Sequence, residues 1–213
     1  VPTGQHAAHL LMQAELEGVI CSGARRGKQF TYALLEERVA PARSWDRDES
    51  LAELTRRYFT TRGPATLRDF SWWSGLTIAD AKRGASAAGS YLRRERRDDR
   101  TEWVTPSTPV AIPRTRTAHL LPNYDEYFIG FKDRSAIGRR LKGSAVPRAE
   151  EFPAHVLFVD GQIVGGWKRM LAKPAEIELQ VTAALTSAER KLVDTAARWL
   201  GRFLELPVRV HGG

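Results

Sequence analysis

Apolar residues follow a helical spacing through most of the first half of the chain. Four segments repeat them at intervals of three and four residues, which predicts helices. These segments are residues 5–18, 51–61, a short stretch between Gly63 and Gly75, and 78–88. Thr66 lies three residues before Asp69, the spacing of a capping box at a helix start. Thr77 and Asp80 repeat it, so both short helices have predicted first residues.

Two pairs of strand-like runs interrupt the helices and are rich in cations. The first pair is 19–22 and 30–34, and the second is 91–95 and 101–104. Short polar or glycine-bearing loops join both pairs, which predicts two β-hairpins. The first loop carries Arg25, Arg26 and Lys28, and the second hairpin carries Arg93, Arg94, Arg96, Arg97 and Arg100.

Three helices followed by a hairpin is the order of the winged helix-turn-helix fold. Residues 44–108 are expected to form one complete unit of this kind. Its predicted core consists of Leu54, Tyr58, Leu67, Phe70, Trp73, Leu76 and Ile78. Residues 1–43 hold one helix before their hairpin, so we expect a partial unit in which Leu10, Leu11 and Leu16 lack partners. On this interpretation the chain is a fragment or a naturally shortened homologue.

The pattern changes after Pro106, where a proline-rich connector (105–122) runs into a strand. Residues 155–170 read as a hairpin whose turn is Asp160 and Gly161, and 175–185 as a further strand. Thr186 with Glu189 caps a predicted amphipathic helix over 187–204, and residues 207–212 close with a short strand. The apolar stripe of that helix is Leu192, Ala196, Trp199 and Phe203. The predicted fold class is α+β: a partial winged helix (1–43), a complete one (44–108) and a mixed, β-barrel-like domain (109–213).

The net charge of the chain indicates the kind of partner that it binds. The formal net charge is +8, and an excess of cations favours a polyanion such as nucleic acid. Only seven of the 33 basic residues are lysines, and such an excess of arginine is also typical of a GC-rich genome. Nucleic-acid binding is therefore favoured only where the basic residues cluster. No apolar run approaches membrane-spanning length, and one cysteine, Cys21, favours a reducing cytoplasm.

Three stretches together resemble a known family: RRYFTTRGPATLRDFSWWSGL, LLPNYDEYFIGFKDRSA and VLFVDGQIVGGWKR. They are similar to the bacterial winged-helix DNA-binding domain-containing proteins, the group that includes the AlkZ and YcaQ DNA glycosylases. The resemblance covers most of residues 50–170. It implies tandem winged helices and a β-barrel-like domain that form a C-shaped channel around duplex DNA, and metal-free excision of alkylated or cross-linked bases.

The catalytic signature of that family is a Gln-x-Gln or Gln-x-Asp motif in its N-terminal winged-helix region. None of the five glutamines in this chain has Gln or Asp two residues later. Gln13 and Glu15 come nearest, but residues two apart on a helix do not face each other. We therefore predict no catalytic residue within these residues. We also predict no metal site, because no Cys or Glu set completes a zinc site with His6 and His9, and no cofactor.

The stretch 123–136 mixes carboxylates with aromatic residues and allows two interpretations. It is either a strand, or a short helix capped by Asn123 or Asp125 and ended by Gly130. Asp125 then caps backbone donors and Asp133 pairs with Arg134 or another arginine at a domain junction. Alternatively, Asp125, Asp133 and Arg134 support DNA binding or catalysis.

The mode of DNA binding follows from where the cations lie. In a sequence-reading protein, helix 78–88 would present base-reading side chains, and here it offers Lys82, Arg83 and Ser86 among small residues. The arginines gather instead on the hairpin, where they suit phosphate or minor-groove contacts. We expect a cytoplasmic monomer whose partner is double-stranded DNA. It is expected not to associate with a membrane, to need no cofactor and to lack excision activity. The alternatives are an active glycosylase when full length, and a winged-helix transcriptional regulator.

Overall fold

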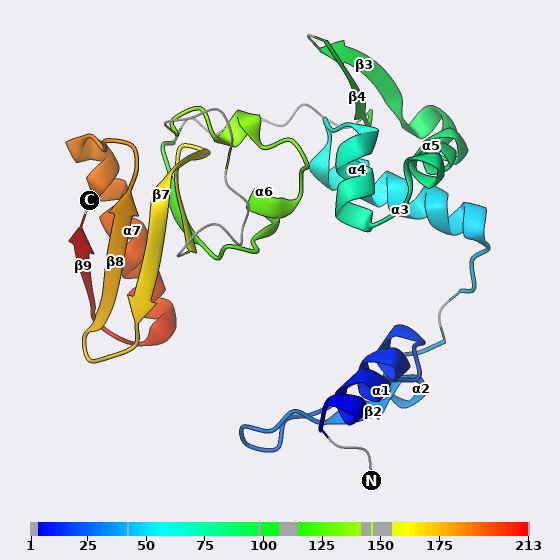
Figure 1. Ribbon diagram of the computed structural model, residues 1–213, viewed down its shortest axis with the longest axis horizontal. Coiled ribbons are helices and arrows are strands. Elements are labelled where there is room, and N and C mark those ends of the chain that lie inside the picture. The colour runs from blue at the N-terminus through cyan, green and yellow to red at the C-terminus, as the bar shows by residue number, and fades with distance from the viewer. Residues whose placement is uncertain are drawn as a thin grey trace. The chain divides into compact units, whose positions relative to one another are not determined.

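The computed structural model describes residues 4–41, 43–97, 99–106, 115–141, 146 and 155–212. It divides into two compact units, Val1–Asp46 and Arg47–Gly213. The architecture is mixed α+β, as predicted (Figure 1). The predicted domain boundaries at 43/44 and 108/109 stay predictions, and residues 107–114 lie outside the described residues.

The first unit is a helix followed by a small hairpin. Its elements are α1 (Gly4–Leu16), β1 (Ile20–Ser22), β2 (Tyr32–Leu34) and α2 (Leu35–Arg38). The two strands pair antiparallel with Cys21 opposite Ala33, so the predicted hairpin is confirmed. Neither helix has a buried residue, and Leu10 and Leu16 are exposed.

The second unit begins with three helices and a hairpin. They are α3 (Arg47–Arg62), α4 (Leu67–Ser74), α5 (Ile78–Ala87), the 3-10 turn η1 (Gly89–Tyr91), β3 (Arg93–Arg97) and β4 (Arg100–Val104). Thr66 accepts from the backbone N–H of Asp69, and Thr77 from that of Asp80, so both predicted caps form. Gly75 ends α4 in the left-handed conformation that glycine adopts without strain.

Aromatic rings fill the core of this helical part. Tyr58 and Phe70 are fully buried, and Tyr58 packs on Phe59, Phe70 and Trp73 with ring centroids 5.0–5.2 Å apart. The expectation for Ile78 was wrong, because this residue is exposed. It is the first residue of α5, and Ala81 and Ala85 face the core instead. These small residues suit a close crossing of α3 and α5, where a Cβ at Gly84 would overlap Thr55 Oγ1.

A five-stranded sheet organises the rest of the unit in the order β5-β6-β7-β8-β9. The strands are β5 (Ala118–Leu121), β6 (His155–Val159), β7 (Gln162–Met170), β8 (Ala175–Val181) and β9 (Val208–Gly212). Only the last pair is parallel. Asp160 and Gly161 both take positive φ in the β6–β7 turn, as predicted. Barrel closure stays a prediction.

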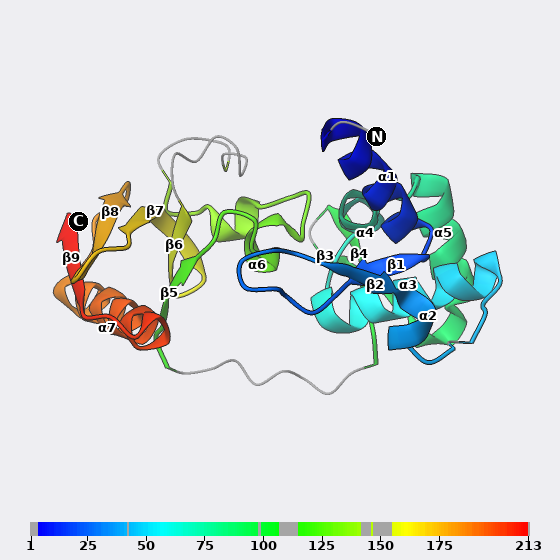
Figure 2. The ribbon, with the colours of Figure 1, turned by 90° about the horizontal axis from the view of Figure 1, so that it is seen from below.

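Helices cover both faces of this sheet. On one face, α7 (Ser187–Leu204) packs on Leu157, Val159 and Ile177 (Figure 2). On the other, the short helix α6 (Glu126–Ile129) inserts Phe128 against Val156, Phe158 and Ile163. A 3-10 turn, η2 (Ser135–Ile137), follows α6. The sheet is therefore the middle layer of three.

The buried side of α7 differs from the predicted stripe. Trp199 and Phe203 are exposed by 64% and 82%, while Val193, Ala197 and Gly201 are buried. The reason is the size of the residues on that side. A Cβ at Gly201 would lie 2.8 Å from Val208 Cγ1 and 2.9 Å from Leu206 O, so only small residues let α7 approach β9. An apolar pattern alone does not show which of two neighbouring helix faces is packed.

The predicted capping box of α7 forms, and it lowers the pKa of Glu189. Glu189 accepts from the Thr186 backbone N–H at 2.8 Å and pairs with Arg140 and Arg116 at 2.9 Å each. The Thr186 N–H first, and then Arg140, hold the pKa of Glu189 at about 2 against an ordinary 4.5, although burial opposes this.

Glu189→Gln is expected to lower the free energy of unfolding by about 2 kcal/mol at neutral pH. A lowered folded-state pKa stabilises the fold above pH 4.5, and this contribution is lost as pH falls toward about 2. The difference between parent and variant should therefore shrink across that window. Urea titrations at several pH values measure it, and a difference that stays constant with pH would contradict the account.

Candidate nucleic-acid interface

The β3–β4 hairpin carries half of the predicted DNA-binding residues and projects from the helices (Figure 1). Side chains alternate between the two faces of a strand, so the pairing register sorts these residues. Glu95 lies opposite Glu102, and Arg96 lies opposite Thr101. One face, called the paired face, holds Arg93, Glu95, Arg97, Arg100, Glu102 and Val104. The other, called the open face, holds Arg94, Arg96, Thr101 and Trp103.

Carboxylates neutralise much of the paired face. Arg97 lies 3.2 Å from Glu95 and 3.6 Å from Glu102, and Arg93 lies 3.8 Å from Glu95. Arg100 forms an ion pair with Asp133. These arginines remain about half exposed or more, so they keep access to solvent while their charge is largely balanced.

The open face keeps its positive charge. In the described part of the chain no carboxylate pairs with Arg94 or Arg96, and both are exposed. The Arg94 guanidinium lies over the Trp103 ring, 5.8 Å from its centroid. Trp103 is itself held by two backbone hydrogen bonds to Ala65, at 2.7 and 3.3 Å. The base of the hairpin is thus anchored to the segment between α3 and α4.

The other predicted cations are distributed over separate elements. On α5, Arg83 pairs with Asp48 at 2.7 Å, while Lys82 is exposed. In the first unit, Arg25 stacks on Phe30 at 4.5 Å, and Arg26 pairs with Gln29 through the backbone. Lys28 is exposed in the same loop.

The stretch 123–136 adopts the helical alternative. Asp125 caps α6 by accepting from the Tyr127 backbone N–H at 2.9 Å, and Gly130 follows the last helical residue. Asp133 accepts from the Ser135 N–H and pairs with Arg100. Partial burial opposes ionisation of Asp133, but Ser135 and Arg100 outweigh it and lower its pKa. Arg134 lies over the Phe128 ring at 4.9 Å.

Two carboxylates, Asp69 and Glu126, join this stretch to the helices through contacts with distant residues that the sequence analysis did not predict. Asp69 Oδ2 accepts from the Thr66 N–H and hydroxyl, while its Oδ1 accepts from the backbone N–H groups of Lys132 and Asp133 at 2.9 and 3.2 Å. Glu126 accepts from Arg62 and from the Trp73 indole N–H. The capping pattern identified one role of Asp69; the second depends on a segment more than 60 residues away.

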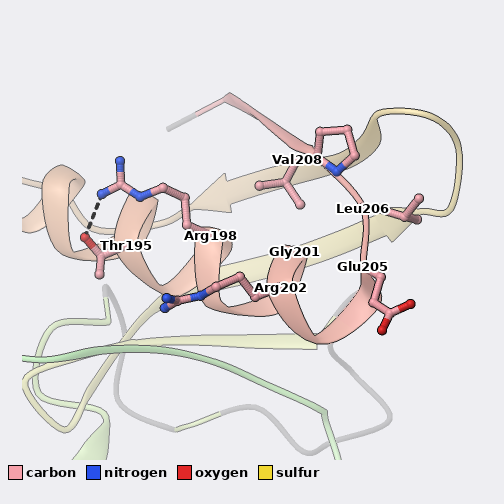
Figure 3. A pocket seen from close by; sticks show the side chains of 8 residues that line it. Thr195, Arg198, Gly201, Arg202, Glu205, Leu206 and Val208 are labelled. Carbon is pink, nitrogen blue, oxygen red and sulfur yellow. Dashed lines mark hydrogen bonds between the residues drawn. The ribbon is translucent and has the colours of Figure 1, made fainter.

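A groove of about 540 Å³ runs beside the second half of α7 (Figure 3). Arg198 and Arg202 point along it, and Arg198 donates to Thr195 at 3.0 Å. The Arg202 guanidinium stacks on the Trp199 ring at 3.7 Å, and Glu205 adds a carboxylate at one end. Its charged groups are of both signs, so the groove presents a weaker case for an anion than the hairpin.

The described residues contain neither a set of side chains that could hold a metal ion nor a helix that could span a membrane. They contain no group of three or more His, Cys, Asp or Glu side chains arranged to hold a metal ion. Within the same residues, no helix combines the length and apolar character needed to cross a bilayer.

Comparison with known proteins decides the family. The model of the DNA glycosylase AlkZ-like family matches residues 2–203. The chain belongs to this AlkZ-like family. The resemblance seen in the three sequence stretches is thereby confirmed.

A relative and a solved structure from Streptomyces sahachiroi are similar to this chain. An interstrand DNA cross-link repair glycosylase is 26% identical over 163 residues, which cover 71% of this chain and 43% of that protein. The solved structure of DNA glycosylase AlkZ superposes with a TM-score of 0.67 at 21% identity over 91% of this chain and 55% of that one. The chain thus spans about half the length of these relatives, and the structural match establishes the shared fold.

Proposed function

We propose that this chain binds duplex DNA through phosphate contacts made by the open face of the β3–β4 hairpin. The observation that carries the proposal is the charge of that face, where Arg94 and Arg96 have no carboxylate partner among the described residues. Unpaired guanidinium groups are suited to bidentate hydrogen bonds with phosphate. Lys82 is exposed on α5, and Arg93 and Arg97 stay more than half exposed beside Glu95 and Glu102, so these three residues can add weaker phosphate contacts.

We propose that the helices α3–α5 and the hairpin are arranged as in a winged helix, and that these helices act as a scaffold for the hairpin. Ala65 lies between α3 and α4 and pairs with Trp103 of β4, which is where a winged helix places its short additional strand. On α5, Arg83 is engaged by Asp48, so few free side chains remain to read base edges. Binding should therefore depend weakly on sequence.

We further propose that these residues bind DNA without excising a base. A Gln-x-Gln or Gln-x-Asp pair is absent from the 213 residues, and the relatives are longer than the segment matched. The second candidate is an active glycosylase for alkylated or cross-linked bases, and it is favoured by the family and by the cross-link repair relative. A sequence-specific regulator is third.

Salt dependence tests phosphate binding directly. With about five cations on phosphates and a slope near 0.9 per contact, affinity for a labelled duplex should fall by roughly 10² to 10³ between 50 and 200 mM salt. Fluorescence anisotropy with two unrelated duplexes provides the measurement. A slope near zero would exclude phosphate binding, and a specificity ratio above about 10³ for one sequence would favour a regulator.

Excision is tested separately. An alkylated duplex incubated with the chain, then treated with alkali, breaks wherever a base has been removed. Intact strands are the expected result, and breaks above the protein-free control would establish the glycosylase instead.

A further inference from the structure

A slot of about 330 Å³ lies on the sheet face opposite α7, beside α6. Its floor comes from β5 and β6. Thr117, His119 and Leu121 alternate along β5 and so share one face, and Phe158 lies directly opposite His119 in the ladder. Asp125 and Tyr127 complete the lining from α6. A volume of this size is at the lower end of that found for small-molecule sites.

An aromatic ring forms one wall of the slot. Tyr127 makes an edge-to-face contact with Phe158, with centroids 5.1 Å apart and planes at 77°. Its hydroxyl donates to the Gly161 carbonyl at 3.4 Å, which holds the ring in place. The residue is nevertheless 49% exposed, so ring surface remains available for stacking.

Two polar groups of the slot keep unused hydrogen-bonding capacity. Asp125 uses Oδ1 to cap α6, and among the described residues no donor reaches Oδ2. His119 is exposed on the edge strand and likewise has no hydrogen-bond partner in the described part of the chain. A carboxylate accepts only, whereas an imidazole both donates and accepts. Asp125 and His119 can therefore together hydrogen-bond to the edge of a heterocycle that carries both donors and acceptors.

We propose that the slot binds a planar, hydrogen-bonding heteroaromatic ring, namely a nucleobase turned out of the duplex. This inference rests on the proposed DNA-binding function and assigns a second site to it. Stacking on Tyr127 provides base-independent affinity, and Asp125 with His119 hydrogen-bond to the ring edge. The Asp125 carboxylate disfavours an anion here, and a single imidazole with a single carboxylate is too few ligands for a metal ion.

Free 2-aminopurine riboside tests the slot without a duplex, because stacking on an aromatic ring quenches its fluorescence. Titration of the full chain should give saturable quenching with a Kd on the order of 0.1 mM, as expected for a ligand of nucleoside size. Tyr127→Leu should abolish it. Asp125→Asn, which retains the cap of α6, should weaken binding about tenfold.

Tyr124→Leu is the matched control, because Tyr124 is exposed to a similar extent but does not line the slot. It should bind the riboside like the parent, and circular dichroism melting verifies that each variant folds. Tyr127→Leu should also keep the salt-dependent affinity for an unmodified duplex, whereas variants of the open face should lose that affinity and keep riboside binding. Absence of saturable quenching in the parent, or equal loss in Tyr124→Leu, would overturn the slot while leaving the hairpin proposal standing.

Discussion

Asp69→Ala is expected to lower the free energy of unfolding of the Arg47–Gly213 unit by about 3 to 5 kcal/mol. The change removes the capping box of α4, and it leaves the N–H groups of Lys132 and Asp133 without their acceptor in a partly buried place. Losing the Asp69 half of the capping box costs up to about 1 kcal/mol, and each donor left unsatisfied away from water costs about 1 to 3 kcal/mol. Urea denaturation followed by tryptophan fluorescence measures the loss.

Asp80→Ala is the matched control for this change. Asp80 holds the same position in α5, but it interacts with Thr77 and with the exposed Arg47 and accepts from no distant backbone group. Its replacement keeps the bond from the residue-80 N–H to the Thr77 side chain, so it should destabilise the unit much less than Asp69→Ala does. Equal losses in the two variants would show that the Asp69 contacts to residues 132 and 133 contribute nothing.

Arg94→Ala with Arg96→Ala is expected to weaken duplex binding by about 10² at low salt. Two charged hydrogen bonds of about 1.5 kcal/mol each are removed, and the slope of log affinity against log salt should fall by about 1.8. The structural reason is that no carboxylate among the described residues competes for these two guanidinium groups. Anisotropy titrations at four or more salt concentrations give both quantities.

Arg93→Ala with Arg97→Ala removes the same formal charge from the same strand and serves as the comparison. Because Glu95 and Glu102 already balance these arginines, affinity should fall several-fold less and the slope should change by less than one unit. If both double variants behaved alike, net charge rather than the open face would determine binding.

Local chemistry was readable from the sequence with good accuracy. The caps at Thr66, Thr77 and Thr186 and the turn at Asp160 and Gly161 depend on residues within a few positions, and all of them form. The hairpins followed from the same kind of signal. The caps are encoded by side chains that hydrogen-bond backbone three residues away, and the turn by two residues that adopt positive φ, so these features need no distant partner.

Features that depend on distant partners were not readable. Which side of α7 is buried depends on how closely Gly201 lets Val208 approach, and the apolar pattern cannot supply this. The balance of charge on the hairpin depends on strand register and on Asp133, which lies some 30 residues away. The slot combines β5, α6 and the β6–β7 turn, and it exists only once those elements have assembled.

Segment 126–133 places neighbouring residues in two different cores. Phe128 is buried among the residues of the sheet, while Phe131 packs against the aromatic cluster of the helices. Only two residues lie between these two anchors, so unfolding of either core displaces the anchor of the other. The helices and the sheet should therefore unfold in one cooperative step, and a substitution that loosens either of them lowers the stability of both.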